Sequence, residues 1–392
     1  MAALGTFWGY RREDGSAGVR NHLVVIPSVI CANTVAQRVA ALLPGAVAIP
    51  HPHGCAQVGD DVTQTEKVLA GAAANPNVGA ALIIGLGCET CQASQVADLA
   101  QAMAPGRPME SFYIQETGGS IKAIAHGVET GKRLMERIGA QQRERIPLSE
   151  LVIATECGGV DLSSMLAANP TVGHVSDRVV GAGGTVLLTE TPELVGAGDV
   201  LVRRARDPGV AQALRDVLQS AEQEAARLDR RTPPEDVAAS DPTPGGTTTG
   251  IEASLSCLEK AGSSRVEGVL AFAGRPSGRG LYVMDAPAQE TVAVSAMAAA
   301  GAQVCLFTTG RGSPLGNAIS PVIKVCGNPE TLERMGDNMD FSTAAVMEGS
   351  ARPRDLAPQL AQLLLDVCSG QLTNAEIIGH QEFGIHRIGP TV

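Results

Sequence analysis

The sequence predicts an α/β protein with two open, mostly parallel sheets that are covered by helices on both faces. Short, continuous apolar runs of strand length alternate along the chain with longer Ala-rich stretches of helical length. Continuous apolar strands are typical of parallel sheets, because both faces of such a sheet are buried. Only 3% of the 392 residues are aromatic while 45 are glycine, so Val, Leu, Ile and Ala must build the cores between tight turns.

The first sheet is predicted from runs in the N-terminal half. These runs are LVVIPSV (23–29), AVAIP (46–50), VGAALIIGLG (78–87), SFYIQ (111–115), LVIAT (151–155) and GGTVLLTE (183–190). Each of the first five is followed by a turn rich in Gly or Cys and then by a helical stretch, and the last leads into a long polar helix near 208–231. This rhythm indicates βα units of one open sheet.

The rhythm stops at 230–250, where Pro, Gly and Thr dominate, and it resumes with VEGVLAFAG (266–274), AQVCLFTTG (302–310) and PVIKVCGN (321–328). A segment of this composition is either an interdomain linker or an active-site loop. We therefore predict a first α/β domain at 1–235, a loop or linker at 236–260 and a second α/β domain at 261–392.

Charge and cysteine usage exclude several function classes. The formal net charge of −11 and the lack of a basic, aromatic-bearing cluster argue against nucleic-acid binding. No apolar run approaches the ~20 residues of a membrane span, and no secretion signal opens the chain. Nine scattered cysteines then favour buried thiols or metal ligands over disulfides, and we expect a cytoplasmic protein without membrane or nucleic-acid partners.

Several predicted strands end in polar or thiol side chains beside glycines. The segments are HPHGCAQVGDD with His51 and Cys55, GLGCETC with Cys88 and Glu89, IQETGGSIK with Gln115, and ATECGGVD with Cys157 and Asp161. Parallel strands bring such ends to one edge of a sheet, where imidazole, thiolate and carboxylate suit Fe²⁺, Mn²⁺ or Zn²⁺. The alternative is that each cysteine is a small buried apolar side chain near a turn.

Two glycine-bearing segments carry cations suited to an anionic substrate. GYRREDGSAGVRN places Arg20 and Asn21 directly before the first strand, and FTTGRGSPLG places Arg311 after a later one, with Lys324 following. Arginine binds a carboxylate through two parallel hydrogen bonds, and backbone N–H groups in such turns assist. The first segment could equally be a solvated turn.

Other motif classes find no support. The chain has no phosphate-binding G-x-x-x-x-G-K-[ST] and no G-x-S-x-G elbow. A nicotinamide dehydrogenase is disfavoured because no strand precedes a proper glycine fingerprint with its acidic residue. The lone C-x-x-C at Cys88 and Cys91 has no second pair, so it is weak evidence for zinc or for a redox motif.

Taken together, these blocks resemble the altronate/galactarate dehydratase family, which also includes the large subunit of sulfolactate sulfo-lyase. The resemblance runs from Gly9 to Val392 through the segments above, GGTVLLTETPELVGA (183–197), KAGSS (260–264) and the closing TNAEIIGHQEFGIHRIGPTV (373–392). It implies elimination of water, or of sulfite in the sulfo-lyase branch, from a hydroxy-acid with stimulation by Fe²⁺ or Mn²⁺. It also implies a separate small subunit, since many relatives carry an extra N-terminal domain.

We accordingly predict a metal-dependent hydro-lyase that converts a small, sugar-acid-like hydroxy-carboxylate into a 2-oxo acid, in a homo-oligomer. The assigned metal ligands are His51, Cys55, Cys88, Glu89 and Cys157, with Fe²⁺ first and Mn²⁺ or Zn²⁺ as alternatives. The substrate would be held by Arg20, Asn21, Gln115, Arg311 and Lys324. Proton transfer is assigned to Glu190, Glu193 and Asp161, because elimination needs a base for the α-proton and an acid for the leaving group.

Departures from the family pattern keep two alternatives open. DPTPGGTTTGIEASLSC (241–257) is shorter than the usual segment and lacks its lysines, and the 192–198 segment ends in Gly198 where the family has a glutamate. A smaller or less hydroxylated acid therefore suits this chain better than a sugar acid. The alternatives are sulfite release from a sulfonated hydroxy-acid and a noncatalytic partner subunit that retains the fold.

Overall fold

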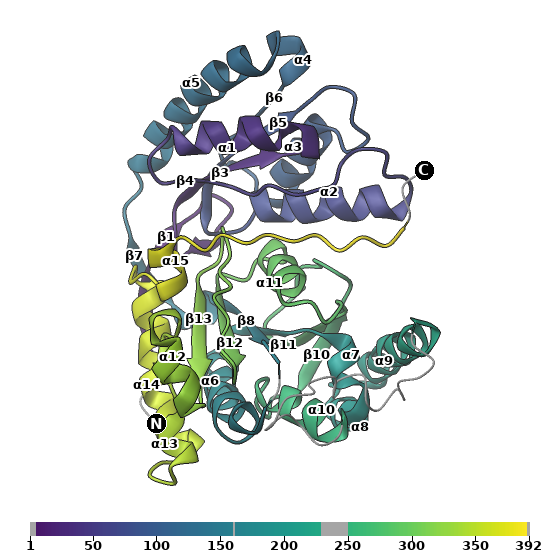
Figure 1. Cartoon of the computed structure of the whole chain (residues 1–392), viewed down its shortest axis with the longest axis vertical. Helices are drawn as coiled ribbons and strands as arrows, with labels where there is room; N and C mark the ends of the chain where they lie inside the picture. Colours follow the sequence, from purple (N-terminus) through teal and green to yellow (C-terminus); the bar gives the residue numbers. More distant parts are fainter. Residues whose placement is uncertain (1–4, 160, 229–249, 390–392) are drawn as a thin grey trace.

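The computed structural model describes residues 5–159, 161–228 and 250–389, and within them two parallel sheets form the framework (Figure 1). The predicted α/β class with two open, mostly parallel, helix-covered sheets is confirmed. No helix in these ranges is both long and apolar enough to cross a bilayer.

The smaller sheet has the strand order β4-β3-β5-β6, and every neighbouring pair is parallel. Its strands are β3 (His22–Pro27), β4 (Ala46–Ala48), β5 (Val78–Gly85) and β6 (Met109–Tyr113). Its helices are α1 (Asn33–Ala41), α2 (Asp60–Ala73), α3 (Ala93–Met103), the short α4 (Ile114–Thr117) and α5 (Ser120–Gly139).

Side chains on this sheet alternate between two apolar layers. Leu82 and Ile84 of β5 pack with α1 and α5, whereas Ala81 and Ile83 pack with α2 and α3. All eight residues of β5 are buried, which explains the unbroken apolar run in the sequence.

The larger sheet has the order β10-β11-β9-β8-β12-β13-β14, again with parallel neighbours. Its strands are β8 (Val152–Cys157), β9 (Thr185–Leu188), β10 (Val266–Leu270), β11 (Gly280–Met284), β12 (Val304–Thr309), β13 (Val322–Cys326) and β14 (Phe341–Ser342). One face packs on α6 (Asn169–Gly181), α10 (Gly250–Glu259) and α14 (Pro353–Cys368), and the other on α11 (Glu290–Ala299).

The remaining helices lie around this larger sheet (Figure 1). They are α7 (Thr191–Leu194), α8 (Gly198–Arg203), α9 (Pro208–Leu228), α12 (Pro329–Arg334), α13 (Ala344–Met347) and α15 (Asn374–Ile378).

The two halves share one apolar layer, since buried side chains of α2 and α11 belong to the same cluster between the sheets. A small antiparallel sheet of β1 (Thr6–Arg11), β2 (Ala17–Gly18) and β7 (Glu144–Pro147) also joins them. The C-terminal segment crosses between the halves toward α2 (Figure 1), where Ile388 donates a backbone hydrogen bond to Asp61.

The sheets divide the chain at a different place from the predicted domain boundary. β8 and β9 precede residue 235, yet they lie in the middle of the sheet that β10 to β14 complete. Backbone pairing with strands after 260 decides this, and the apolar pattern of a strand does not encode its partner. Of the predicted linker, 236–249 lie outside the described residues, while residues 250–259 form α10 with a buried face.

Candidate active site at the carboxyl end of the large sheet

The connections of the larger sheet diverge at β8. The chain passes from β8 to β9 on one side, whereas β12, on the other side of β8, leads away to β13. Ligands of open α/β sheets gather beyond the carboxyl ends of strands at such a switch point. The residues at this position are Glu156 and Cys157 of β8 and Thr308 and Thr309 of β12, with Gly158 donating a hydrogen bond to the Thr308 carbonyl at 2.8 Å.

A buried ion pair lies beside this end of the sheet. Glu190 follows β9 and its Oε2 accepts a hydrogen bond from Lys260 Nζ at 3.1 Å, with both side chains almost completely buried. Glu156 is fully buried next to this pair, and neither of its carboxyl oxygens has a hydrogen-bond partner among the described residues. Buried carboxyl groups without partners are costly, so they often mark a site that binds something else.

Glu190 also has an uncommon backbone conformation. Its φ of 66° and ψ of 57° lie in the left-handed region, at the residue that precedes α7. A non-glycine residue in this region carries strain of roughly 1 to 3 kcal/mol, and such residues cluster at functional sites. The turn directs the Glu190 side chain to Lys260 instead of continuing along the strand.

A second chain of contacts leads from the same turn. Cys257 of α10 donates a hydrogen bond from Sγ to Glu193 Oε2 at 3.0 Å, and its thiol lies close enough to Cys157 to shift the pKa of that thiol. Both thiols are buried, whereas Glu193 is half-buried. Glu193 therefore links the buried cluster to the protein surface.

The environment shifts the pKa of two of these acids. Burial, and then the negative charge of Glu190, raise the pKa of both Glu156 and Glu193 well above the usual range. Burial alone would lower the pKa of Lys260, but Glu190 and the two thiols outweigh it and raise the pKa. The site thus combines two carboxyl groups of raised pKa with a third that is ion-paired to a lysine, an arrangement suited to acid–base chemistry.

The polar network behind β8 and β12 fixes this end of the sheet. Thr308 Oγ1 donates to Asn169 Oδ1 at 2.5 Å and to the Glu156 carbonyl at 3.2 Å, while Asn169 Nδ2 donates to Ser256 Oγ at 2.8 Å. Residues 164–168 just before α6 form a π-helical turn, a feature frequent at functional sites. These bonds tie β8, β12 and α10 together around the cluster.

Asp161 lies at the rim of the site. Its Oδ1 accepts bonds from Ser163 Oγ and the Ser164 backbone N–H. The carboxyl group packs against Gly310, where a Cβ atom would come within 2.0 Å of it. Asp161 therefore shapes the loop after β12.

The loop after β12 forms the exposed side of the rim. Arg311 is exposed, and Ser313 bonds to Glu290 at 3.4 Å. The structure thus brings Glu190, Glu193, Asp161, Arg311 and Cys157 to the end of the large sheet.

Lys324 takes a different role from the predicted one. Its side chain is fully buried beneath the loop, and its ammonium group donates to the carbonyls of Leu315 and Pro314. It supports the loop from below.

The predicted residues of the N-terminal half lie at the carboxyl end of the smaller sheet. There the His51–Gln57 loop contacts the loop after β5, since Thr90 and Cys91 donate backbone bonds to the Gly54 carbonyl. Cys55, Cys88 and Gln115 are exposed, and Gln115 lies 3.8 Å from Cys88 Sγ. Cys157 belongs to the other sheet.

The buried polar atoms of His51 and Glu89 are used in building these loops. His51 Nε2 bonds to the Pro27 carbonyl at 2.7 Å, and His51 Nδ1 accepts from the His53 backbone N–H. Glu89 accepts from Ser28 Oγ and from the N–H groups of Leu86 and Gly87. A neutral histidine bonded in this way has no lone pair left for a metal ion.

The predicted metal ligands therefore do not form one donor set. In the described parts of the chain, no three His, Cys, Asp or Glu side chains are grouped so that they could hold a metal ion. Because Cys157 is separated from the other four and His51 is already bonded on both ring nitrogens, this set does not suit a single divalent ion.

Arg20 and Asn21 are structural residues. Arg20 makes two bonds to the Glu376 carboxylate, at 2.7 and 2.9 Å, and donates to the carbonyls of Val19, Val367 and Gln371. All five N–H groups are thus used, so Arg20 cannot also hold a substrate carboxylate as predicted. Asn21 bonds to Arg12 and to the Ile138 carbonyl.

Sequence reasoning placed Glu156 among the polar residues at the strand ends but gave it no role, and it did not single out Lys260 or Cys257 as site residues. Lys260 and Cys257 lie at the end of α10, where no strand-end pattern marks them. No pattern in the sequence predicts that Lys260 is buried, because lysine is almost never fully buried unless it is paired.

Comparison with known proteins identifies the family to which this chain belongs. The D-galactarate/altronate dehydratase C-terminal model matches residues 148–391, and the model of the second domain of D-galactarate dehydratase/altronate hydrolase matches residues 9–139. The chain belongs to the galactarate/altronate dehydratase family. The division between the two matched domains falls where the smaller sheet gives way to the larger one.

Three similar proteins illustrate the breadth of this family. The (2R)-sulfolactate sulfo-lyase subunit beta of Chromohalobacter salexigens is 35% identical, over 98% of this chain and 97% of that protein. The altronate dehydratase of Bacillus subtilis is 34% identical over 99% and 78%, and the galactarate dehydratase (L-threo-forming) of Escherichia coli is 32% identical over 93% and 73%. The galactarate/altronate dehydratase family thus contains hydro-lyases, as the sequence predicts, and a lyase that is built from subunits.

Proposed function

We propose that this chain is a lyase that eliminates water from a small hydroxy-carboxylic acid and yields a 2-oxo acid. The observation that carries the proposal is the buried Lys260–Glu190 pair beside two carboxylic acids with raised pKa values, at the switch point of the larger sheet. Altronate and galactarate dehydratases among the relatives support the reaction class.

In the proposed reaction, Glu190 removes the proton α to the substrate carboxylate. Lys260 is ion-paired with Glu190 and offers positive charge near the resulting enediolate. Glu193, whose pKa is raised and whose side chain is half-buried, donates a proton to the departing hydroxyl group. Because the departing hydroxyl group is on the β-carbon and the α-carbon keeps its own hydroxyl group, the product is an enol, which collapses to the 2-oxo acid.

The loop after β12 would bind the substrate carboxylate. Arg311 is exposed there, and Ser313 lies beside Glu290 and Gly158 at the end of the strands. Arginine supplies two parallel hydrogen bonds to a carboxylate. Asp161 would position this loop through its contact with Gly310.

We retain a divalent metal ion as part of the proposal, with Fe²⁺ first and Mn²⁺ or Zn²⁺ as alternatives. The ligand set predicted from the sequence does not suit such an ion. None of the proton transfers by Glu190 and Glu193 involves the metal. Protein purified without oxygen and incubated with Fe²⁺ is expected to retain about one ion per chain after desalting. Full activity in chelator-treated protein without bound metal would contradict metal dependence.

Sulfite release is the second candidate function. The similarity to the beta subunit of a sulfolactate sulfo-lyase covers nearly the whole length of this chain and of that protein. The shortened, lysine-free 241–257 segment argues against a polyhydroxylated substrate. The same base would remove the α-proton, and a sulfonate would leave in place of the hydroxyl group. That relative also supports a separate small subunit for this chain, which we propose together with homo-oligomerisation and a cytoplasmic location.

A substrate panel tests the function and separates the candidates. Fe²⁺-treated protein, with any small subunit encoded beside it, is incubated with short hydroxy-acids, sugar acids and sulfonated hydroxy-acids, and 2-oxo acid and sulfite are measured. We expect 2-oxo acid without sulfite, from a short hydroxy-acid. Sulfite release would favour the second candidate, and no turnover of any compound would favour a noncatalytic partner subunit.

A further inference from the structure

A buried arginine far from the proposed active site in sequence has no carboxylate hydrogen-bond partner among the residues that the structure describes. Arg12 is only 5% exposed, and its guanidinium donates to the Pro76 and Arg20 carbonyls and to the side-chain oxygens of Asn21 and Gln141. All four acceptors are neutral. A buried cation that is solvated only by neutral groups favours an added anion nearby.

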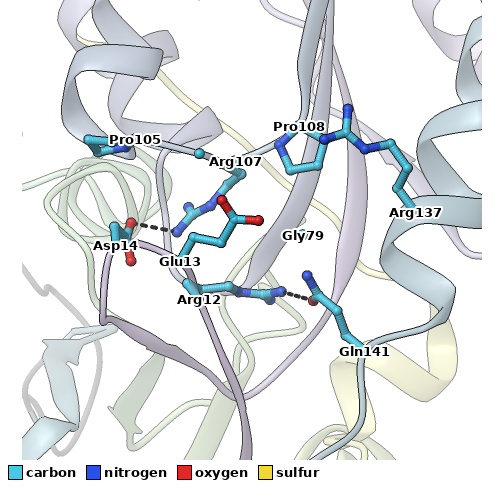
Figure 2. Close-up of a pocket in the computed structure, with 10 residues that line it drawn as sticks. Arg12, Glu13, Asp14, Gly79, Pro105, Arg107, Pro108, Arg137 and Gln141 are labelled. Atoms are coloured by element: carbon cyan, nitrogen blue, oxygen red, sulfur yellow. Dashed lines mark hydrogen bonds and ion pairs between the residues drawn. The ribbon is translucent and has the colours of Figure 1, made fainter.

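Arg12 lines a pocket with two more arginines. Figure 2 shows Arg12, Arg107 and Arg137 arranged around this space, with Gln141 beside Arg12. The turn between β1 and β2, the turn before β6 and the end of α5 supply these side chains. Gly79 of β5 also lines it, and a Cβ atom there would come within 2.2 Å of the Asn21 oxygen that binds Arg12.

The pocket's own acids leave positive charge unbalanced. The Asp14 carboxylate forms an ion pair with the Arg107 guanidinium, with an N–O distance of 3.0 Å. Arg137 and Glu13 form no hydrogen bond or ion pair with other described residues, and both are exposed. Figure 2 shows Glu13 extending into the pocket between Arg107 and Arg12. Arg12 and Arg137 thus face a single carboxylate, that of Glu13, which no hydrogen bond or ion pair with the described residues holds in place.

The pocket has room for a small ligand. Its volume is about 90 Å³, so a single small oxyanion can enter it.

We propose that this pocket binds a small oxyanion, of the phosphate, sulfate or short-carboxylate class, between Arg12 and Arg137. Glu13 acts as the internal counter-ion and moves out when the oxyanion enters. The site is separate from the proposed active site, and the proposal does not depend on the lyase function.

Titration calorimetry of the full chain with inorganic phosphate at low ionic strength tests the proposal. We expect saturable binding of one phosphate per chain. Arg137→Gln should weaken it about tenfold, as expected for a lost charge-assisted hydrogen bond, and Glu13→Gln should tighten it by a similar factor. Lys132→Gln removes an exposed charge from the same helix and should change the affinity less than twofold.

The outcomes separate a specific site from diffuse charge. Absence of saturable binding by the unmodified chain, or equal weakening by Lys132→Gln and Arg137→Gln, would overturn the proposal. A Glu13→Gln variant with unchanged affinity would overturn the counter-ion role. Competition by sulfate but not by acetate would assign the pocket to tetrahedral oxyanions, and the reverse would assign it to carboxylates. Both test residues are exposed, so the variants should fold normally, which circular dichroism verifies.

Discussion

Replacement of Glu190 by glutamine is expected to lower kcat/KM by about 10²- to 10⁴-fold, the contribution of a general base. Glutamine keeps the size of the side chain but cannot accept the substrate proton. The measurement is the initial rate of 2-oxo acid release on the substrate that the panel identifies. Glu259→Gln is the matched control, because Glu259 is exposed on the same helix as Cys257 and should leave the rate unchanged.

The same substitution also has a stability cost, which must be separated from catalysis. Removing one partner of a buried ion pair typically costs about 3 to 5 kcal/mol, because the other charge is left unpaired. Here the cost should be smaller, since Glu156, whose pKa is raised by burial and by Glu190, lies beside Lys260 and can ionise to replace Glu190.

A double variant makes this separation directly. Glu190→Gln combined with Lys260→Met removes both charges and should recover most of the unfolding free energy, because a buried pair can often be replaced by apolar groups without loss. It should remain inactive. If the double variant regained activity, Glu190 would have only a structural role.

The framework of this protein was largely predictable because burial leaves a clear pattern in the sequence. The run at 78–87 is apolar throughout since β5 is buried on both faces, and Glu190 and Glu193 were identifiable as acids directly after such a run. The domain limits were harder to predict from the sequence, because strands of one sheet can lie far apart in the chain. β9 and β11 are hydrogen-bonded neighbours although about 95 residues separate them.

The errors at the site have a common physical origin. His51, Glu89 and Arg20 are residue types suited to metals and substrates, but each is consumed by hydrogen bonds to nearby backbone groups or to a distant carboxylate. The sequence shows which donors exist and does not show which are already satisfied. Lys260 was missed for the converse reason, since tertiary packing alone brings the end of α10 to Glu190.

Replacement of Arg20 by methionine is expected to destabilise the chain by about 3 to 5 kcal/mol, since it leaves the Glu376 carboxylate and two distant carbonyls unpaired. Denaturant unfolding of the variant measures this loss. Arg354→Met, at an exposed arginine of α14, is the control and should change the unfolding free energy by less than about 0.5 kcal/mol. Equal stability of the two variants would contradict the structural role.

The acid sensitivity of the unmodified chain provides an independent test of the Arg20–Glu376 pair. Burial alone would raise the pKa of Glu376, but hydrogen bonds and charge from Arg20 outweigh it and lower the pKa. A depressed carboxyl pKa in the folded state contributes stability above the unfolded value of about 4.3, and this contribution is lost as the pH falls through the folded pKa. The Arg20→Met variant lacks that contribution, so the difference in unfolding free energy between the two proteins should shrink below about pH 4. A difference that stays constant from pH 7 to pH 3 would show that Arg20 stabilises the chain through its carbonyl contacts and not through Glu376.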